Sequence, residues 1–346
     1  MNVSQVKEAA RQWVIEDVRQ STDFMGAYLV GSTTHLPDNF DSPTSSDVDI
    51  AVRLAQPNPE NKPTKFLYRD VLIEVNYPPW SDINSPEVVL GEHRRAGGFR
   101  LANILSDPSG ELSSLFGALS NDFAKRRWAG RRCEDAMRNT LGFLKRVDES
   151  ALCHDQVTCW LFGRAGPCHI LLTAALQNPT VRRRSLETRT LLDGYGHLDL
   201  YESLLKLQGS ARMGKLRVEY RLAAVTEIFD FAKEIIKPPH RFASDISEVG
   251  RPISIGGSRE FIDGGYYREA ICWIVATYSR CLAILHNDAS RDEQENYAAG
   301  FHELLADLGI TSFADLQERS QRAREFLHRV WDVVEAIMGA NAEIEE

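Results

Sequence analysis

The sequence predicts an α+β protein, in which an N-terminal mixed-sheet domain precedes a mostly α-helical, bundle-like domain. Three strand-like apolar runs lie within the first 77 residues, whereas long stretches of helical periodicity follow from about Asn121. The length of 346 residues exceeds that of a typical single domain. We therefore expect two domains, at residues 1–118 and 119–346.

The N-terminal part alternates helical and strand-like segments. Residues 4–20 place apolar side chains at helical spacing, with Ser4 available as the cap. Loops rich in Pro, Asn, Asp and Ser separate the three strand-like runs, which cover residues 26–32, 46–54 and 66–77. Ser85 and Pro86 are typical of a helix start. Residues 99–115 indicate a short strand that ends in a Pro-Ser-Gly turn.

The C-terminal part contains several candidate helices and one long connection. The stretch 270–286 is strongly apolar but contains Arg280, so a buried helix explains it better than a membrane span. Residues 237–265 are rich in Pro and Gly and predict a connecting loop, in which Gly257 and Ser258 are loop residues. The role of this 237–265 loop stays open.

Composition and charge narrow the function classes. The net charge of −9 disfavours broad electrostatic wrapping of nucleic acid, although it leaves room for a local basic patch. The N-terminal stretch has neither the apolar core nor the cleavage pattern of a secretory signal. We therefore expect a cytoplasmic protein with no membrane partner.

Two carboxylates stand one residue apart within the second strand-like run. Asp47 and Asp49 project to the same face of a strand, while Val48 and Ile50 face the opposite side. Their mutual repulsion is costly unless a cation lies between them, and Mg²⁺ prefers such oxygen ligands together with substrate phosphates. The pair therefore indicates a metal site.

A third carboxylate, Glu74, lies in the following strand-like run. If this strand pairs beside the one that carries Asp47 and Asp49, Glu74 joins them. Such a cluster can hold two metal ions about 3.5–4 Å apart. Alternatively, Glu74 is a general base that takes the proton of an acceptor. Asp70 is the nearest competing carboxylate, and it lies nearer the strand start.

Gly31 and Ser32 follow the first strand-like run. Glycine lets the backbone approach a phosphate closely, and Ser32 offers a hydroxyl and a backbone amide at a turn or helix start. Phosphate binding beside a metal site indicates a nucleoside triphosphate (NTP) as co-substrate.

The combination of Gly31-Ser32, Asp47-Val48-Asp49 and Glu74 resembles the nucleotidyltransferase superfamily that includes DNA polymerase beta. The helical C-terminal half is similar in kind to those of kanamycin and other aminoglycoside nucleotidyltransferases. The resemblance covers about the first third of the chain. The loop between Ser32 and Asp47 is longer than in the compact antibiotic-modifying members.

This resemblance implies a Mg²⁺-dependent transfer of a nucleoside monophosphate, AMP in the first instance, from an NTP to an acceptor hydroxyl, with release of pyrophosphate. Asp47 and Asp49 would ligate metal, and Glu74 would be the third ligand or the base. Gly31 and Ser32 would hold the β- and γ-phosphates. The expected acceptor is a small molecule, with an aminoglycoside-type antibiotic as the leading candidate and antibiotic resistance as the consequence.

Two other functions stay open. The acceptor can be a tRNA or a protein, as in nucleotidylating toxins, with the helical domain as the docking surface. Alternatively, the chain is an inactive relative that only binds nucleotide. The sequence decides neither the preferred NTP nor the oligomeric state, and it is compatible with a homodimer.

Two further groups of residues have structural interpretations. The six cysteines lack the paired spacing of zinc modules, so we expect reduced, packed thiols. The cluster Arg182, Arg183 and Arg184 is interpreted as surface charge, with contact to an anionic ligand as the alternative.

Overall fold

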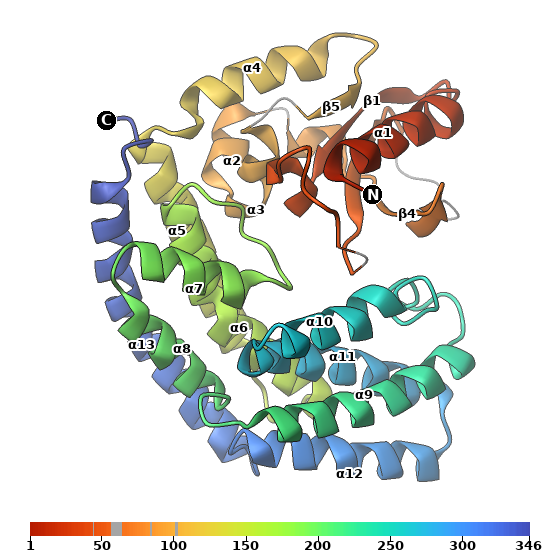
Figure 1. Cartoon of the computed structure of the whole chain (residues 1–346), viewed down its shortest axis with the longest axis vertical. Coiled ribbons are helices and arrows are strands. Elements are labelled where there is room, and N and C mark those ends of the chain that lie inside the picture. Colours follow the sequence, from red (N-terminus) through yellow and green to blue (C-terminus); the bar gives the residue numbers. More distant parts are fainter. Residues whose placement is uncertain (44, 57–63, 84, 101–102) are drawn as a thin grey trace. The chain divides into compact units, whose positions relative to one another are not determined.

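The computed structural model describes residues 1–43, 45–56, 64–83, 85–100 and 103–346 (Figure 1). Contacts divide these residues into two compact units. The first comprises Met1–Ala136, Leu172–Val181 and Glu335–Glu346, and the second comprises Met137–Leu171 and Arg182–Val334. The first unit is therefore built from three separate segments, because the chain returns to it twice after leaving residue 136.

The N-terminal unit contains all the strands that the structure describes. Its elements up to residue 123 are α1 (Val3–Trp13), η1 (Val14–Val18), β1 (Phe24–Val30), η2 (Ser32–His35), β2 (Val48–Leu54), β3 (Lys65–Tyr68), β4 (Val71–Asn76), η3 (Trp80–Asp82), α2 (Pro86–Gly91), α3 (His93–Ala96), η4 (Gly97–Phe99), β5 (Ile104–Ser106) and α4 (Glu111–Phe123). The remaining elements are helical. They are α5 (Arg126–Lys145), α6 (Cys153–Ala174), α7 (Arg184–Gly194), α8 (Leu198–Gln208), α9 (Lys215–Ile235), η5 (Pro252–Gly256), α10 (Gly257–Asp263), α11 (Tyr267–Asp288), α12 (Arg291–Asp307) and α13 (Phe313–Ala340).

The five described strands form one mixed sheet in the order β3-β4-β2-β1-β5. Strands β2 and β4 are parallel, and the other neighbouring pairs are antiparallel. The structure thus has the predicted α+β class, with a mixed sheet near the N-terminus followed by helices.

The two faces of the sheet carry different side chains because successive residues of a strand alternate. On β2, Val48, Ile50 and Val52 are buried in a core that α1 completes. Figure 1 shows α1 in red along the sheet. Asp49 and Arg53 belong to the opposite face of β2. The alternation therefore separates an apolar face from a polar one.

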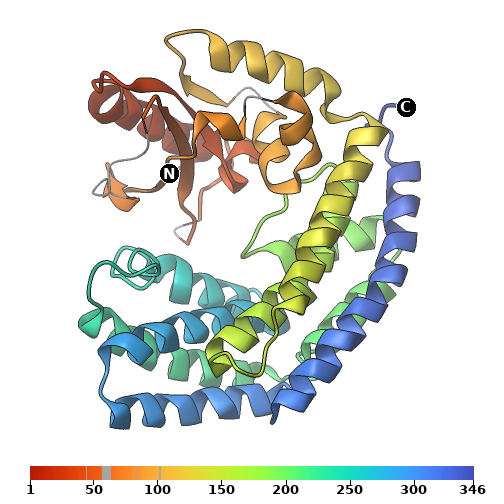
Figure 2. The ribbon, with the colours of Figure 1, turned by 180° about the vertical axis from the view of Figure 1, so that it is seen from behind.

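The polar face of the sheet is partly covered by aromatic rings from α4 and η4. The ring of Tyr28 on β1 lies 5.1 Å from that of Phe99 and 5.6 Å from that of Phe116. Buried Arg53 donates to the Tyr28 hydroxyl at 2.6 Å and to the Pro78 carbonyl at 2.7 Å. Figure 2 shows α4, in yellow, beside α2. These contacts fix the strands near the carboxylates.

The stretch 66–77, expected as one strand, is a hairpin. Tyr68 pairs with Val71, and the two residues between them, Arg69 and Asp70, have φ of 48° and 63°. A two-residue turn with positive φ at both positions joins antiparallel strands with the correct twist. The prediction was wrong because neither turn residue is Gly or Asn. Without such a turn signal, the apolar pattern of residues 66–77 indicates one continuous strand. Asp70 therefore lies in the turn, immediately before β4 begins at Val71.

Three smaller expectations are also corrected. The first helix begins at Val3 and is capped by Asn2 instead of Ser4, and its last part is the π-helical turn η1. Helical structure resumes at Glu111, before residue 121. The segment 237–265 is partly helical, since it contains η5 and α10, and Gly257 begins α10 instead of lying in a loop.

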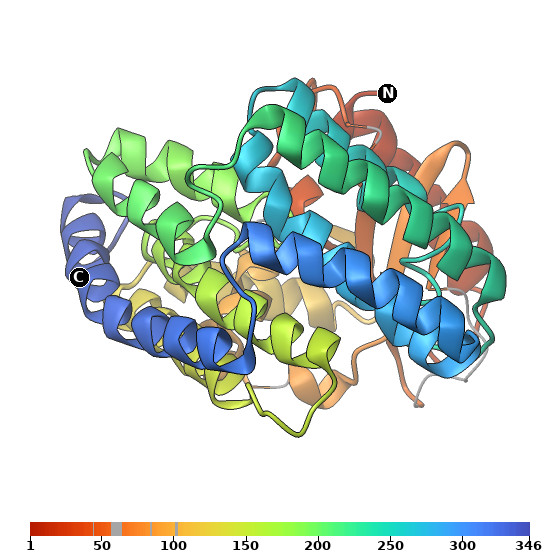
Figure 3. The same cartoon turned by 90° about the horizontal axis from the view of Figure 1, so that it is seen from below.

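Helix α11 is the centre of the helical core. Almost all its residues from Glu269 to Leu285 are buried, as expected for the stretch 270–286, and it packs against α9, α10 and α12. Arg221 on α9 donates to Asp307 and Glu303 on α12, which joins the two helices that Figure 3 shows in green and blue. Within the described residues, none of the helices has the length and apolar character needed to cross a bilayer.

The β3-β4 turn gives a stability test. Replacing Asp70 by Gly relieves positive φ at an exposed position, so we expect the free energy of unfolding to rise by about 0.5–1 kcal/mol. Urea unfolding monitored by circular dichroism measures the change. The control Asp70→Ala removes the carboxylate but keeps a β-carbon, so it should not stabilise the protein. Equal stabilisation by both variants would contradict the turn assignment.

Candidate functional site

The three predicted carboxylates converge at one place on the polar face of the sheet. Asp49 on β2 is in register with Glu74 on the parallel neighbour β4, and Asp47 immediately precedes β2. One ligand oxygen from each of the three lies within 4.8 Å of the others. The cluster therefore follows directly from strand pairing and from the two-residue alternation of β2.

Gly31 lies against one of these carboxylates. It has φ of +73° and follows Val30, which pairs with Asp49 across β1 and β2. A β-carbon at Gly31 would lie 2.0 Å from Oδ2 of Asp49, a distance that no side chain can occupy. Only glycine satisfies both the left-handed backbone and this close approach.

The Gly31 turn is tied to the strand that carries the carboxylates. Ser32 begins the short 3₁₀ helix η2, directly after Gly31. The hydroxyl of Thr33 donates to the carbonyl of Asp47 at 3.3 Å, and that of Thr34 donates to the carbonyl of Gly31 at 2.8 Å. The structure thus places Ser32 one residue from the glycine that contacts Asp49.

A lysine that the sequence analysis did not consider completes the cluster. Nζ of Lys65 on β3 lies 3.2 Å from Oδ2 of Asp47 and 2.8 Å from Oε2 of Glu74. Its side chain is only 4% exposed. Lys65 is directly opposite Glu74 in the β3-β4 ladder. An ammonium group therefore bridges two of the three carboxylates.

The charge of the cluster remains unbalanced despite this lysine. Burial raises the pKa of Asp49 well above its ordinary value, and the neighbouring Asp47 and Glu74 raise it further. Burial also raises the pKa of Glu74 to about 7, although Lys65 opposes that shift. Both shifts mean that the ionised carboxylates lack sufficient compensation.

The donor set fits a hard divalent cation. Three carboxylates and one ammonium leave an excess of negative charge, and carboxylate oxygens are the ligands that Mg²⁺ prefers. Asp47, Asp49 and Glu74 would hold the ion. Lys65 would compete with it, because the ammonium already contacts two of these side chains.

Lys65 was missed because the β3-β4 turn was missed. If Arg69 and Asp70 form a two-residue turn, residues equally far from the turn on β3 and β4 are cross-strand partners. Lys65 then pairs with Glu74. Cross-strand neighbours of opposite charge stabilise a ladder. The cross-strand register that follows from a turn at Arg69 and Asp70 was thus the signal that could have located Lys65.

The arginine cluster 182–184 is not simply surface charge. Arg184 is 2% exposed, and its guanidinium lies 5.1 Å from the ring centre of Phe162. Nη1 of Arg182 lies 4.0 Å from a carboxylate oxygen of Glu260. The surface interpretation is therefore wrong for Arg184, whose long side chain packs on an aromatic ring.

The cysteines are free thiols, four of them buried: Cys133, Cys168, Cys272 and Cys281. Among the described residues, the cluster of Asp47, Asp49 and Glu74 is the single convergent group of metal-ligating side chains.

Comparison of the chain with protein-family models, with curated proteins and with solved structures finds no match.

Substitution of Gly31 tests the close approach to Asp49. Gly31→Ala should lower the free energy of unfolding by roughly 2–4 kcal/mol, because backbone strain and displacement of the carboxylate add together. The matched control is Gly110→Ala. Gly110 has a similar φ of +78° but no atom within 4 Å of the added β-carbon, so only strain of about 1 kcal/mol is expected. Equal losses in urea unfolding would contradict the contact.

Substitution of Lys65 tests whether the cluster accepts a cation. Lys65→Met removes the competing ammonium, so Mn²⁺ should bind about tenfold more tightly, the equivalent of roughly 1.4 kcal/mol. Isothermal titration calorimetry measures the affinity. Lys7→Met is the control, because Lys7 pairs with Asp38 instead of the cluster. Unchanged Mn²⁺ affinity in Lys65→Met would show that the ammonium and the metal ion do not compete for the same carboxylate oxygens.

Proposed function

We propose that this protein is a Mg²⁺-dependent nucleotidyltransferase that moves a nucleoside monophosphate, in the first instance AMP from ATP, to a hydroxyl of a small molecule. The observation that carries the proposal is the convergence of Asp47, Asp49 and Glu74 next to the Gly31 turn. A carboxylate cluster beside a tight glycine turn suits a metal-bound polyphosphate.

The reaction is a substitution at phosphorus. The acceptor oxygen forms a bond to the α-phosphorus, and the bond from that phosphorus to the oxygen bridging it to the β-phosphate breaks. Pyrophosphate leaves with the bonding electron pair, and the hydroxyl proton passes to a base. Bound Mg²⁺ would supply neutralisation of the phosphate oxygens.

When Asp47 and Asp49 alone ligate the metal, Glu74 is the candidate for the base; otherwise it is the third ligand. Its raised pKa, about 7, lies near neutral pH, where a group accepts and releases protons most effectively. Lys65 contacts Glu74 and would hold its carboxylate in place or bind a phosphate oxygen after the pair separates. Gly31 and Ser32 would receive the β- and γ-phosphates, because a glycine backbone allows close approach.

The overall charge favours a cationic acceptor. A net charge of −9 attracts cations over long range and repels polyanions. An aminoglycoside-type antibiotic carries several ammonium groups and several hydroxyls, so it remains our proposed acceptor class.

The position of Lys65 favours a second candidate function, an inactive relative that binds nucleotide without transferring it. The ammonium already compensates Asp47 and Glu74 at 3.2 and 2.8 Å. A cluster that an internal cation stabilises has less need of metal ions. Metal-dependent turnover distinguishes this candidate from the transferase.

The proposed activity is tested by pyrophosphate release. Purified protein is incubated with Mg²⁺, each of the four NTPs and a panel of aminoglycosides. Asp49→Asn should reduce the rate by at least 10³-fold, since it removes a metal ligand. Asp70→Asn is the control, because Asp70 is an exposed carboxylate in the β3-β4 turn and should leave the rate unchanged.

Equal rates for Asp49→Asn and the unmodified protein would contradict the metal assignment. Mg²⁺-dependent NTP binding without turnover on any acceptor would support the inactive relative. Transfer of labelled nucleotide only to tRNA or protein would replace the small-molecule acceptor with a macromolecule.

A further inference from the structure

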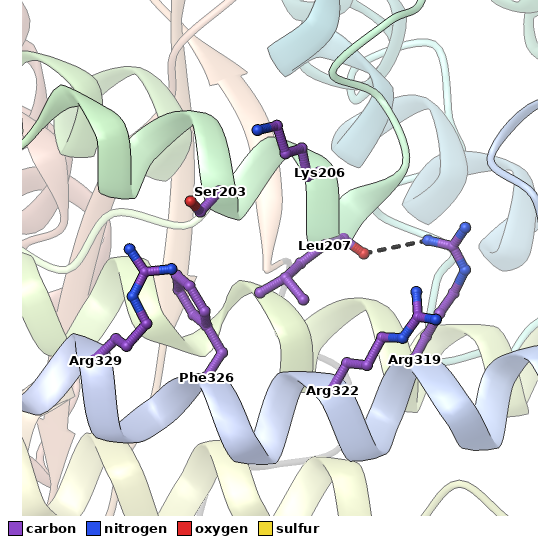
Figure 4. A pocket seen from close by; sticks show the side chains of 7 residues that line it. All are labelled: Ser203, Lys206, Leu207, Arg319, Arg322, Phe326 and Arg329. Atoms are coloured by element: carbon purple, nitrogen blue, oxygen red, sulfur yellow. Dashed lines mark hydrogen bonds between the residues drawn. The ribbon is translucent and has the colours of Figure 1, made fainter.

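The helical unit contains a cationic pocket of about 260 Å³ between α8 and α13. Its lining residues are Ser203, Lys206, Leu207, Arg319, Arg322, Phe326 and Arg329. Figure 4 shows the side chains from α13 directed toward α8, where Leu207 points down between them. Four lining residues are thus cationic and one is aromatic, no carboxylate lines the pocket, and Figure 4 shows the Lys206 ammonium directed away from α13.

Three of these cations, all arginines, lie on one face of α13 together with Phe326. Arg319, Arg322, Phe326 and Arg329 follow each other at intervals of three, four and three residues, which is the spacing of one helical face. From Arg319 to Arg329 this row extends about 15 Å at 1.5 Å per residue. The row is therefore long enough for more than one anionic group.

Only part of this positive charge is neutralised. Arg322 pairs with Glu318, and Nη2 of Arg329 lies 3.7 Å from a carboxylate oxygen of Asp199. Within the part of the chain that the structure describes, Lys206 and Arg319 have no carboxylate at ion-pair distance. An excess of two positive charges remains in a protein whose net charge is −9.

Arg319 is held in place by backbone carbonyls instead of a carboxylate. Its guanidinium donates to the carbonyls of Leu207 at 3.3 Å and Leu308 at 2.5 Å, which fix its position at the end of the pocket. Burial lowers the pKa of Arg319; Arg322 and Arg164 act in the same direction, whereas Asp315 and Glu318 oppose the shift.

The aromatic ring points to a planar ligand group. Phe326 lies between Arg322 and Arg329 along α13, and the guanidinium of Arg329 is 5.2 Å from the centre of its ring. Nucleobases stack on aromatic rings and on guanidinium planes, and arginine pairs with phosphate in a bidentate manner. Inorganic anions and acidic peptides would use the arginines but not the ring.

We infer that the pocket between α8 and α13 binds a nucleotide unit, with its base against Phe326 and its phosphate on Arg322 and Arg319. The unit is either a free nucleotide or one residue of a single-stranded RNA, since both present the same base and phosphate. This site is separate from the carboxylate cluster and needs no metal ion. The inference of a nucleotide site therefore does not depend on the proposed transferase activity.

Binding is measured in EDTA with full-length protein that carries Asp49→Asn, so that the carboxylate cluster cannot hold a metal-bound nucleotide. The probes are AMP and inorganic phosphate by calorimetry and a short fluorescein-labelled single-stranded RNA by anisotropy. Arg322→Gln should weaken AMP or RNA binding about tenfold, as expected for the loss of one charge-assisted hydrogen bond. Phe326→Leu should weaken nucleotide or RNA binding about tenfold through lost stacking and leave phosphate binding unchanged.

The matched control is Arg291→Gln. Arg291 is an exposed helical arginine that pairs with Glu295 four residues away, as Arg322 pairs with Glu318. It lies on α12, outside the pocket, so its loss should leave all affinities unchanged. Thermal unfolding checks that each variant folds.

The outcomes separate the two sources and define failure. Binding of both AMP and RNA, each sensitive to Phe326→Leu, supports a site for free nucleotides, and binding of RNA alone supports a strand. A steep fall of RNA affinity with salt would accompany the second result. The proposal is overturned if no probe binds, if phosphate binds as tightly as AMP and RNA, or if Arg291→Gln weakens binding as much as Arg322→Gln.

Discussion

The parallel pairing of β2 with β4 is the constraint on which the candidate site depends. This register places Asp49 opposite Glu74, and the alternation of β2 adds Asp47 on the same side. A shift of β2 by one residue would turn Asp47 and Asp49 to the other face, away from Glu74. The apolar residues Val48 and Ile50, buried against α1, prevent that shift. The hydrophobic core thus fixes the position of charged groups that repel each other.

Two kinds of cation can reduce this repulsion, and they compete for the same carboxylate oxygens. The ammonium of Lys65 contacts Asp47 and Glu74, and a divalent cation would use the same oxygens. Ion pairs in a buried setting recover only part of the desolvation cost of their charges. The raised pKa of Glu74 and of Asp49 shows that Lys65 alone leaves the cluster undercompensated. The same carboxylate oxygens are thus shared between the ammonium of Lys65 and any divalent cation that the cluster would hold.

Much of the architecture could be predicted from the sequence because it depends on local patterns. The change from strand-like runs to helical periodicity predicted an α+β protein with a helical C-terminal half, and the apolar stretch 270–286 predicted the buried helix α11. The convergence of Asp47, Asp49 and Glu74 beside Gly31 was also predictable, because residue alternation and adjacent strands were sufficient. Failures occurred where the signal was weak. The turn at Arg69 and Asp70 lacks the usual Gly or Asn, and the segment 237–265 contains helices despite its Pro and Gly content.

By itself, the sequence determined the fold class and the alternation that places Asp47 and Asp49 on one side, because both depend on neighbours within a few residues. The close approach of Asp49 that requires glycine at position 31 comes from the pairing of β1 with β2. Only the tertiary structure decided which cations face which anions. Lys65 reaches Glu74 through the pairing of β3 with β4, and Arg319 meets the end of α8 through helices that are more than 100 residues apart in the chain. Such contacts depend on how distant elements pack, and no local pattern of charge or hydrophobicity encodes them.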